Sequence, residues 1–451
     1  MKPNIVFLLI DGLRYDQIYG EFKESFTPNI DSLIEKGTFF KNTFASADGT
    51  VLSLNTIFNS VFSCKINNRA RKIILNKNNL FEVFKNNNYN IYGLVPKIKI
   101  YDTIIEFFQN NNKTYEYFDN TESLNSGLTE KIIKLLKSTK STKQNFYYIH
   151  LSDLHPLREG NIPKGLEKFS DKKFGKSKYA KTVSNIDLHL GEILSNLDLS
   201  NTILIISSDH GERIPYGNIT SNDFEPNFKK TKKIGKKFLP KKSLKLGGKF
   251  LSKISHSIAE TRIKNIPEKL TNYQKRSRDP YFTLSLFDEL LHVPLLFVGY
   301  NIPEKIISTF TRHVDFFPTI FDMLQINYNQ DFIDGISLWP FVNTKKSDEL
   351  YSYIHTMPYE KPHFSDAVGI RTQKYKFFRS ENEKTKNVNL YDLENDPFEN
   401  NNIKKNNSEI IQRFEKIIDN IENERISENT AELTVDEEAM ISEELKKMGY
   451  M

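Results

Sequence analysis

Residues 4–12 read NIVFLLIDG: an asparagine, a run of six apolar residues, and then an acid and a glycine. Its β-branched and aromatic side chains predict a strand buried on both faces. Asp11 follows at the carboxyl end, where open α/β sheets place their ligands, and Gly12 allows a sharp turn. The pattern recurs at residues 203–212, ILIISSDHGE, which deliver Asp209 and His210. We therefore expect two strand ends to meet at one sheet edge and form a metal site.

Size and composition narrow the class of protein. At 451 residues the chain can bury a large core and carry a smaller appended unit. No apolar run approaches the roughly 20 residues of a membrane helix, and the N-terminal run is too short for a signal peptide. The single cysteine, Cys64, excludes an internal disulfide, so a reducing compartment is the expectation. Together these features predict a cytoplasmic protein.

Strand-like and helix-like segments alternate along the chain, which predicts a doubly wound, mainly parallel α/β sheet. Further strands are expected at 89–95, 146–151 and 293–298, and helices at 80–84, 179–197 and 284–291. Residues 27–38 are expected to form a turn and a capped helix, and residues 45–62 a small-residue loop that leads into a helix starting near Thr50. From about residue 350 the pattern changes to short strands at 351–354, 367–371 and 375–378. We expect a catalytic α/β domain at 1–345, a small C-terminal antiparallel-sheet subdomain at 346–425 and a helical tail at 426–451.

A lysine-rich insertion is expected at about 215–280. Residues 229–253 contain eleven lysines, and no acid lies between Glu225 and Glu260. Such a segment could bind an anionic membrane surface or a polyanion, or lie over an anionic substrate as a lid. A solvated excursion without a partner is an equally good interpretation. Because aromatic residues are sparse there, sequence-specific nucleic-acid recognition is not expected.

An ordered series of motifs spans nearly the whole chain. After Asp11-Gly12 come TPNID at 27–31, DLHP at 153–156, SDHGE at 208–212, FDELLHVPL at 287–295, VDFFPT at 314–319, LYDLENDP at 390–397 and a tail at 443–450. This series resembles the sulfatase family of the alkaline-phosphatase superfamily. The resemblance implies an alkaline-phosphatase-like fold and a metal-dependent hydrolase or transferase that acts on sulfuric or phosphoric esters.

The nucleophile position departs from that family. Sulfatases carry a Cys/Ser-x-Pro-Ser-Arg motif whose first residue is oxidised to formylglycine, whereas the matching residues 50–54 read TVLSL. Formylglycine is therefore not expected, and Thr50 is similar to the nucleophile of the phosphoglycerol- and phosphoethanolamine-transferase branches. The family's basic residue before the helix at 284–291 is also missing, and His256 and Arg278 are its nearest candidates.

The resemblance implies one divalent metal ion, Zn, Mn, Mg or Ca, bound by Asp11, Asp209, His210 and Thr50. Two carboxylates and an imidazole suit such ions, and coordination would make a threonine hydroxyl usable as a nucleophile. The alternative is purely structural: both aspartates shape turns, and Thr50 caps the helix that follows it.

Threonine also bears on the substrate. A formylglycine hydrate can expel sulfate by collapsing to the aldehyde, whereas a threonine sulfate must be attacked at sulfur. Phosphoesters are therefore the favoured substrates, and a sulfuric ester hydrolase stays the alternative. A non-catalytic family member that binds polyanions through its lysines is the rival from another class.

Further site residues are expected on neighbouring strand ends. His155 could protonate the leaving oxygen or bind the substrate anion, and Lys97 could clamp a non-bridging oxygen. A loop histidine bonded to backbone and a solvated lysine are the bland interpretations. Glu212 is expected to support the metal ligands through a hydrogen bond, and His292 and His313 are expected to pack.

Overall fold

The computed structural model describes most of the first domain and of the C-terminal subdomain. It covers residues 2–67, 69–117, 122–138, 143–157, 163–213, 276, 286–339, 350–357, 366–424 and 440–444. Apart from Arg276, the predicted lysine-rich insertion lies outside these residues, as do the predicted boundaries near 345 and 425.

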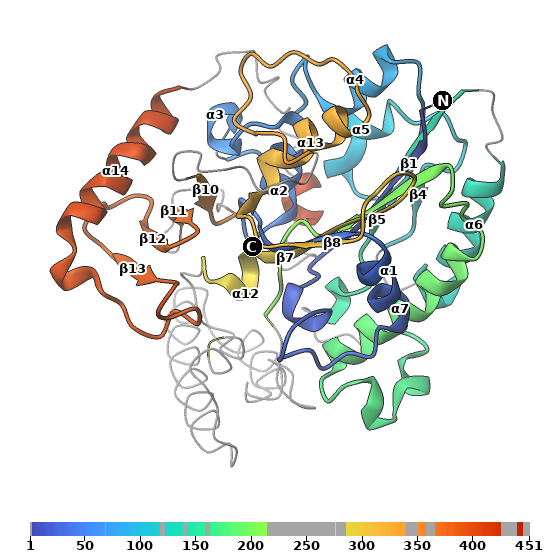
Figure 1. The fold of residues 1–451 in the computed structure, drawn as a ribbon, viewed down its shortest axis with the longest axis horizontal. Coiled ribbons are helices and arrows are strands. Elements are labelled where there is room, and N and C mark those ends of the chain that lie inside the picture. The colour runs from blue at the N-terminus through green and yellow to red at the C-terminus, as the bar shows by residue number, and fades with distance from the viewer. Residues whose placement is uncertain are drawn as a thin grey trace, which may run out of the picture.

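The first domain is built on a nine-stranded, mostly parallel sheet with helices on both faces (Figure 1). The strand order is β4-β3-β5-β1-β6-β7-β2-β8, and β9 pairs with β2. Among the described strands of this sheet, only β7 runs antiparallel to the others, and it lies between β6 and β2. The strands are β1 (Asn4–Ile10), β2 (Thr38–Phe44), β3 (Asn90–Pro96), β4 (Thr114–Tyr115), β5 (Asn145–Leu151), β6 (Thr202–Ser207), β7 (His292–Gly299), β8 (Lys305–Ile307) and β9 (Thr311–Arg312). The predicted α/β class is confirmed.

The register of the central strands brings the two predicted acids level. Strand β1 pairs in parallel with β6, and Leu9 lies opposite Ser207. Two residues further along each chain, Asp11 and Asp209 therefore leave the sheet at the same edge. Strand β5 flanks β1 on its other side, with Ile10 opposite Leu151.

Side chains of β1 alternate between two cores, as a strand buried on both faces requires. The odd-numbered residues, such as Leu9, pack with α2 (Thr50–Asn59), α4 (Leu80–Asn86), α5 (Asp102–Ile105) and α13 (Phe316–Met323). The even-numbered residues, such as Leu8, pack with α1 (Pro28–Lys36), α6 (Leu128–Ser138) and α7 (Lys178–Leu194). Helix α2 therefore starts on the same side of the sheet as Asp11.

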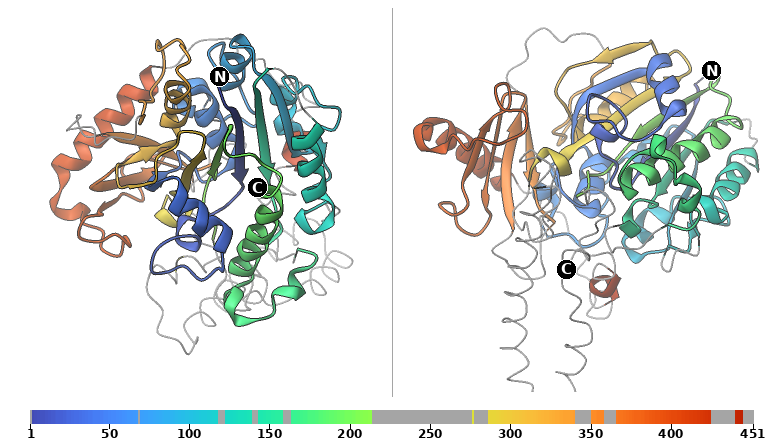
Figure 2. Two further views of the ribbon diagram at one scale, coloured as in Figure 1. Left: turned by 45° about the vertical axis from the view of Figure 1, so that its right-hand side comes forward. Right: turned by 90° about the horizontal axis from the view of Figure 1, so that it is seen from below.

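The C-terminal subdomain is a four-stranded antiparallel sheet in the order β10-β11-β12-β13. Its strands are β10 (Tyr351–His355), β11 (Ala367–Thr372), β12 (Tyr375–Ser380) and β13 (Asn389–Asp392). Helix α14 (Ser408–Asn423) covers one face with Phe414 and Ile418 (Figure 2). This confirms the predicted antiparallel unit, although the sequence analysis did not find β13. Ala47 bridges to His355, so the subdomain abuts the loop that precedes α2.

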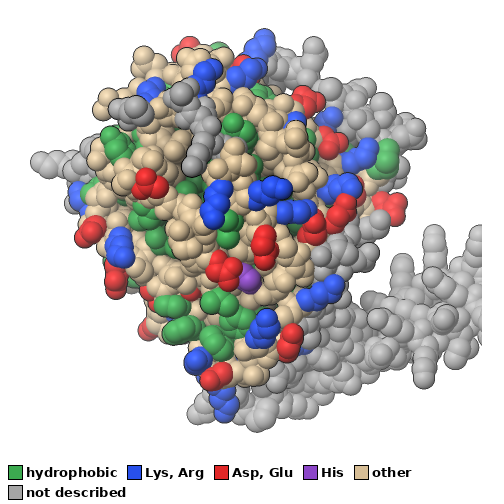
Figure 3. Space-filling model, turned by 90° about the vertical axis from the view of Figure 1, so that its right-hand side faces the viewer, with side chains coloured by type: hydrophobic (Ala, Val, Ile, Leu, Met, Phe, Trp, Pro, Cys, Tyr) green, Lys and Arg blue, Asp and Glu red, His purple; other side chains and the backbone are tan. Residues whose placement is uncertain are grey.

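Two further observations concern the surface and the tail. On the face carried by α6 and α7, basic and acidic side chains are interspersed (Figure 3). Among the described residues, none of the helices has the length and apolar character needed to span a bilayer.

In the predicted tail, residues 440–444 are helical, and Ile441 is buried against the core of the first domain.

The side chain of Asp187 links α7 to the N-terminus of α1, and this link can be tested. Thr27, the N-cap of α1, makes no side-chain capping bond, and the buried Asp187 of α7 accepts instead from Asn29 N (3.1 Å) and Ile30 N (2.8 Å). Asp187→Ala is expected to lower the free energy of unfolding by about 2–3 kcal/mol, because it leaves buried donors unpaired. Asp171→Ala removes an exposed cap and should cost less than about 1 kcal/mol in the same denaturant titration. Equal losses would contradict this role for Asp187.

Candidate metal centre

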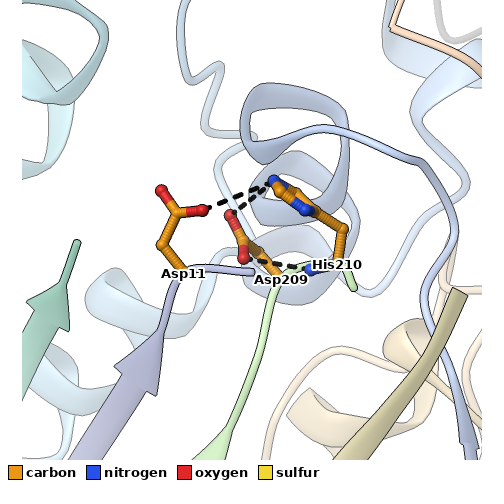
Figure 4. Close-up of side chains that lie close together, drawn as sticks. All are labelled: Asp11, Asp209 and His210. Carbon is orange, nitrogen blue, oxygen red and sulfur yellow. Dashed lines mark hydrogen bonds and ion pairs between the residues drawn. The ribbon is translucent and has the colours of Figure 1, made fainter. Parts of the chain in front are cut away.

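Three buried side chains converge where β1 and β6 end (Figure 4). His210 Nε2 lies 3.5 Å from Asp11 Oδ1 and 3.6 Å from Asp209 Oδ2. One ligand atom from each residue can be chosen so that all lie within 4.8 Å of one another. The structure therefore brings together three of the four residues that the sequence analysis selected as metal ligands; the fourth is Thr50.

Hydrogen bonds between side chains of one strand end and backbone groups of the other fix the two strand ends against each other. Ser208 Oγ accepts from Leu13 N (2.8 Å) and donates to the Ile10 carbonyl oxygen (2.6 Å). Asp209 Oδ1 accepts from Gly12 N (3.2 Å). Gly12 has a φ of +73°, a conformation that costs glycine nothing but strains other residues. Asp209 Oδ1 is thereby occupied, and Oδ2 is left to face His210.

Thr50 is the first residue of α2 and completes the buried group. Its Oγ1 lies 3.4 Å from His210 Nε2, and its hydroxyl is close enough to Asp209 to offset a small part of the rise that burial causes in the pKa of that carboxyl. Gly49 is the N-cap, so Thr50 sits in the first turn of α2, where the backbone N–H groups point out of the helix end. A helix N-terminus at this point favours a negatively charged group beside Thr50.

Burial and mutual repulsion set the electrostatics of the group. Burial raises the pKa of Asp209, and the charge of Asp11 raises it further. Burial also acts to raise the pKa of Asp11, but His150, His155 and His210 outweigh this and hold it below its ordinary value. The pKa of His210 is raised because the two carboxylates outweigh the effect of its burial. Two like charges thus share a dry site, an arrangement that a cation would relieve.

The donor set fits a divalent cation. Asp11 Oδ1 and Asp209 Oδ2 are buried and have no hydrogen-bond partner among the described residues. Buried carboxylate oxygens ordinarily find a donor, so two such oxygens side by side point to a missing positive partner. Two hard oxygens with one imidazole nitrogen suit Zn, Mn or a harder ion.

The other predicted site residues lie in different surroundings. His155 is buried and contacts the Tyr117 hydroxyl through Nδ1. Its charge helps to lower the pKa of Asp11. Lys97 is exposed and pairs with Glu116, outside the buried group. Glu212 is buried against Gly12, and its charge helps to raise the pKa of His210.

Two histidines near the group have more specific roles than sequence reasoning gave them. His150, in β5, lies 3.6 Å from Asp11 Oδ2, and the sequence analysis did not select it. His313 was expected only to pack. Burial lowers its pKa to about 3, and its two ring nitrogens contact Ser46 N (3.4 Å) and Ser208 O (3.2 Å). His313 therefore ties the loop before α2 to the end of β6. His292 does pack, with its ring stacked 4.0 Å from that of Tyr15.

A pocket of about 430 Å³ opens near this sheet edge, between the first domain and the C-terminal sheet. Residues that line it include Tyr15, Phe44, His292 and Arg371, but none of the proposed metal ligands. Arg14, also in its wall, donates from Nη1 to the Glu212 carbonyl oxygen (3.2 Å). The pocket is thus linked to the segment that follows the metal ligands.

Comparison with known families decides the identity. The family model "Sulfatase" matches residues 3–326, and "N-sulphoglucosamine sulphohydrolase, C-terminal" matches residues 281–425. The chain belongs to the sulfatase family. Membership indicates an ester hydrolase, and the family typically uses a divalent metal. The first match spans the sheet that carries Asp11, Thr50, Asp209 and His210.

Several solved structures share the fold of this sulfatase family member. A candidate sulfatase of Bacteroides thetaiotaomicron has a TM-score of 0.62 at 17% identity, covering 93% of this chain and 92% of that one. One from Bacteroides fragilis also has a TM-score of 0.62, at 15% identity, covering 94% and 98%. A third protein, solved with D-glucosamine-2-N,6-O-disulfate as its substrate, has a TM-score of 0.60 at 15% identity, covering 94% and 98%.

One curated relative also matches in sequence. It is an uncharacterized protein of Haemophilus influenzae, 26% identical over 220 residues. The match spans 47% of this chain and 32% of the relative, so the chain matches about a third of that protein's length. This relative adds nothing about substrate.

Asp209→Asn tests whether the carboxylates are held against their own repulsion. The amide keeps an oxygen for Gly12 N and His210 N and removes one of the two facing charges. We expect the metal-free variant to be more stable than the wild type by about 1–3 kcal/mol, because a buried charge without a partner is lost. Stabilisation by added Mn²⁺ or Zn²⁺, seen as a rise in the melting temperature, should disappear. A destabilised metal-free variant that still responds to the metal would refute this.

Asp153→Asn is the matched control and has a prediction of its own. Burial raises the pKa of Asp153 to about 6, and its acceptor bond from Leu124 N only partly opposes this. The unfolded chain then loses the proton near pH 4 but the folded chain near pH 6, so stability falls as pH rises between them. Asp153→Asn should abolish this loss and stabilise the protein by about 3 kcal/mol at pH 7. The response to metal should be unchanged. Denaturant titrations across this pH range check both statements.

Proposed function

We propose that this chain cleaves or transfers phosphoric esters at the buried group of Asp11, Thr50, Asp209 and His210, with Thr50 as the nucleophile. The observation that carries the proposal is the position of the Thr50 hydroxyl, 3.4 Å from His210 Nε2 and close to the Asp209 carboxylate. A threonine that only capped α2 would not need to lie against two proposed metal ligands. The acceptor, water or an alcohol, is left open.

The proposed cofactor is one divalent metal ion. Asp11, Asp209 and His210 would hold it with Thr50, and when bound it would lower the pKa of the threonine hydroxyl and balance negative charge on the ester. The N–H groups at the start of α2 favour an anion beside Thr50 without help from the ion.

The proposed reaction has two stages. Thr50 gives its hydroxyl proton to solvent and Oγ1 forms a bond to phosphorus as the bond to the leaving oxygen breaks, while His155 in its protonated form supplies a proton to that oxygen. Water or an acceptor alcohol then gives a proton to His155 and attacks phosphorus in the phosphothreonine, and the released Thr50 oxygen takes up a proton from solvent. Lys97 stays a predicted clamp for a non-bridging oxygen, a role for which its ammonium group would have to leave Glu116.

A sulfuric ester is the second candidate substrate. It is supported by membership of the sulfatase family and by the structural neighbour that was solved with a disulfated glucosamine. The residue at position 50 argues for the phosphoester, because a threonine sulfate has no route of release except attack at sulfur. Binding of a polyanion by residues 229–253 stays a prediction, since those residues lie outside the described part of the chain.

Thr50→Ala and Thr50→Ser test the nucleophile. With p-nitrophenyl phosphate or a p-nitrophenyl phosphodiester, turnover by Thr50→Ala should fall at least about 1,000-fold, while Thr50→Ser should retain part of it. Mass spectrometry of the quenched wild-type reaction should find the phosphoryl group on the peptide that contains Thr50. Undiminished turnover by Thr50→Ala would remove this residue from the mechanism.

The same assay with p-nitrophenyl sulfate decides between the two esters. Faster turnover of the sulfate would overturn the preference for phosphate. Absence of turnover on every ester, with no thermal response to Zn²⁺, Mn²⁺, Mg²⁺ or Ca²⁺, would instead favour a non-catalytic family member.

A further inference from the structure

We propose that His150 is a positioning residue for the metal ligand Asp11. It would hold the carboxylate oxygen that faces away from His210 and so fix the direction of the oxygen that faces the cation. This inference rests on the proposed metal centre, but it does not depend on Thr50 being a nucleophile or on the choice between phosphate and sulfate.

The sheet places His150 where it can act on Asp11. In the pairing of β1 with β5, His150 lies opposite Leu9, so both side chains point to the sheet face that carries α2. Asp11 follows Leu9 by two residues and leaves the strand toward the same side. His150 is fully buried, and its Nε2 lies 3.6 Å from Asp11 Oδ2.

The imidazole is itself held on both sides. The Tyr148 hydroxyl contacts Nδ1 at 3.0 Å, and the Tyr101 hydroxyl contacts Nε2 at 3.1 Å. Tyr148 belongs to the aromatic core, where its ring packs edge-on against those of Phe7 and Phe58. The ring of His150 therefore cannot turn away from Asp11 without losing two buried hydrogen bonds.

The two oxygens of Asp11 consequently face different partners. Oδ2 faces His150, whereas Oδ1 lies 3.5 Å from His210 Nε2 and has no hydrogen-bond partner among the described residues. A carboxylate fixed at one oxygen presents the other in a single direction. Outer partners of this kind typically contribute about 10- to 100-fold to metal affinity.

The C-terminal helical residues 440–444 brace this arrangement from outside. Tyr101 ends a short 3-10 helix, Lys99–Tyr101, whose first N–H donates to Glu444 Oε2 (2.9 Å). Ile441 packs into the same core as Tyr101 and Tyr148. Contacts thus run from residues near the end of the chain, through Tyr101 and His150, to the proposed metal ligand.

The alternative is a core histidine whose hydrogen bonds are satisfied by tyrosines and which matters only for stability. The two roles differ in what the loss of the imidazole changes. A structural histidine would affect the free energy of unfolding but not the affinity of the folded protein for a cation. A positioning histidine would change that affinity directly.

The test uses the full chain, with Mn²⁺ as the probe and the dissociation constant from titration calorimetry as the readout. His150→Gln should weaken Mn²⁺ binding at least about 10-fold. His189→Gln is the matched control, because His189 is hydrogen-bonded to Thr129 and Asn125 and not to a proposed metal ligand. The affinity of this variant for Mn²⁺ should equal that of the wild type. Denaturant titration without metal separates any loss of stability from the loss of affinity.

Tyr101→Phe provides a second variant, which keeps the ring and removes only the hydroxyl at Nε2. It should weaken Mn²⁺ binding by about 2- to 10-fold, and it is expected to perturb folding less than His150→Gln because it removes a single hydroxyl. Wild-type affinity in His150→Gln or, if that variant fails to fold, in Tyr101→Phe would overturn the role of His150 and leave the metal centre intact. Absence of Mn²⁺ binding by the wild type would overturn both.

Discussion

Two aspartates face each other in a dry interior at the ends of β1 and β6, and much of the surrounding structure serves to hold them there. This position is unfavourable for an ionised carboxylate, because burial and a neighbouring negative charge both disfavour ionisation. Ser208 and Gly12 join the strand ends, and the imidazoles of His150, His155 and His210 offset the charge of Asp11. Repulsion between the two buried carboxylates therefore destabilises the metal-free protein, and a bound cation would remove this repulsion and stabilise the fold.

The segment that carries Asp209 and His210 is also supported from the C-terminal subdomain. Gly211 N donates to Leu290 O in α12 (Asp288–Leu291), and a side chain at Gly211 would lie 2.2 Å from Glu289 O. Asp288, in the same helix, pairs with Lys376 and Arg371 of the second sheet. Buried ion pairs of this kind add little net stability, but they penalise any other arrangement of the two sheets. The subdomain therefore helps to fix the loop that delivers the metal ligands.

A threonine nucleophile, as proposed for Thr50, would change what the site must supply. A formylglycine carries its own route for release of the bound anion, whereas threonine relies on its surroundings both for activation and for release. The chain places Thr50 at the start of a helix and beside Asp209 and His210, which addresses activation. The residue proposed to supply a proton to the leaving oxygen is His155, which is buried and whose charge helps to lower the pKa of Asp11. The proposed chemistry depends on these surroundings more than on the hydroxyl itself.

Sequence alone was sufficient for the α/β class, for the antiparallel C-terminal sheet and for the convergence of Asp11, Asp209 and His210 at one sheet edge. Continuous apolar runs ending in Asp are a local signal, and parallel strands bring their carboxyl ends to one edge whatever their order. The strand order, the reversed direction of β7 and the roles of His150 and His313 could not be predicted. They depend on pairings between residues far apart along the chain: the strands β6 and β7 pair across about 90 positions, and the contacts of His150 with Asp11 and of His313 with Ser46 and Ser208 span more than 100. A histidine in the middle of an apolar strand looks like any other core residue until the neighbouring strand is known, because only that neighbour decides which carboxylate it meets.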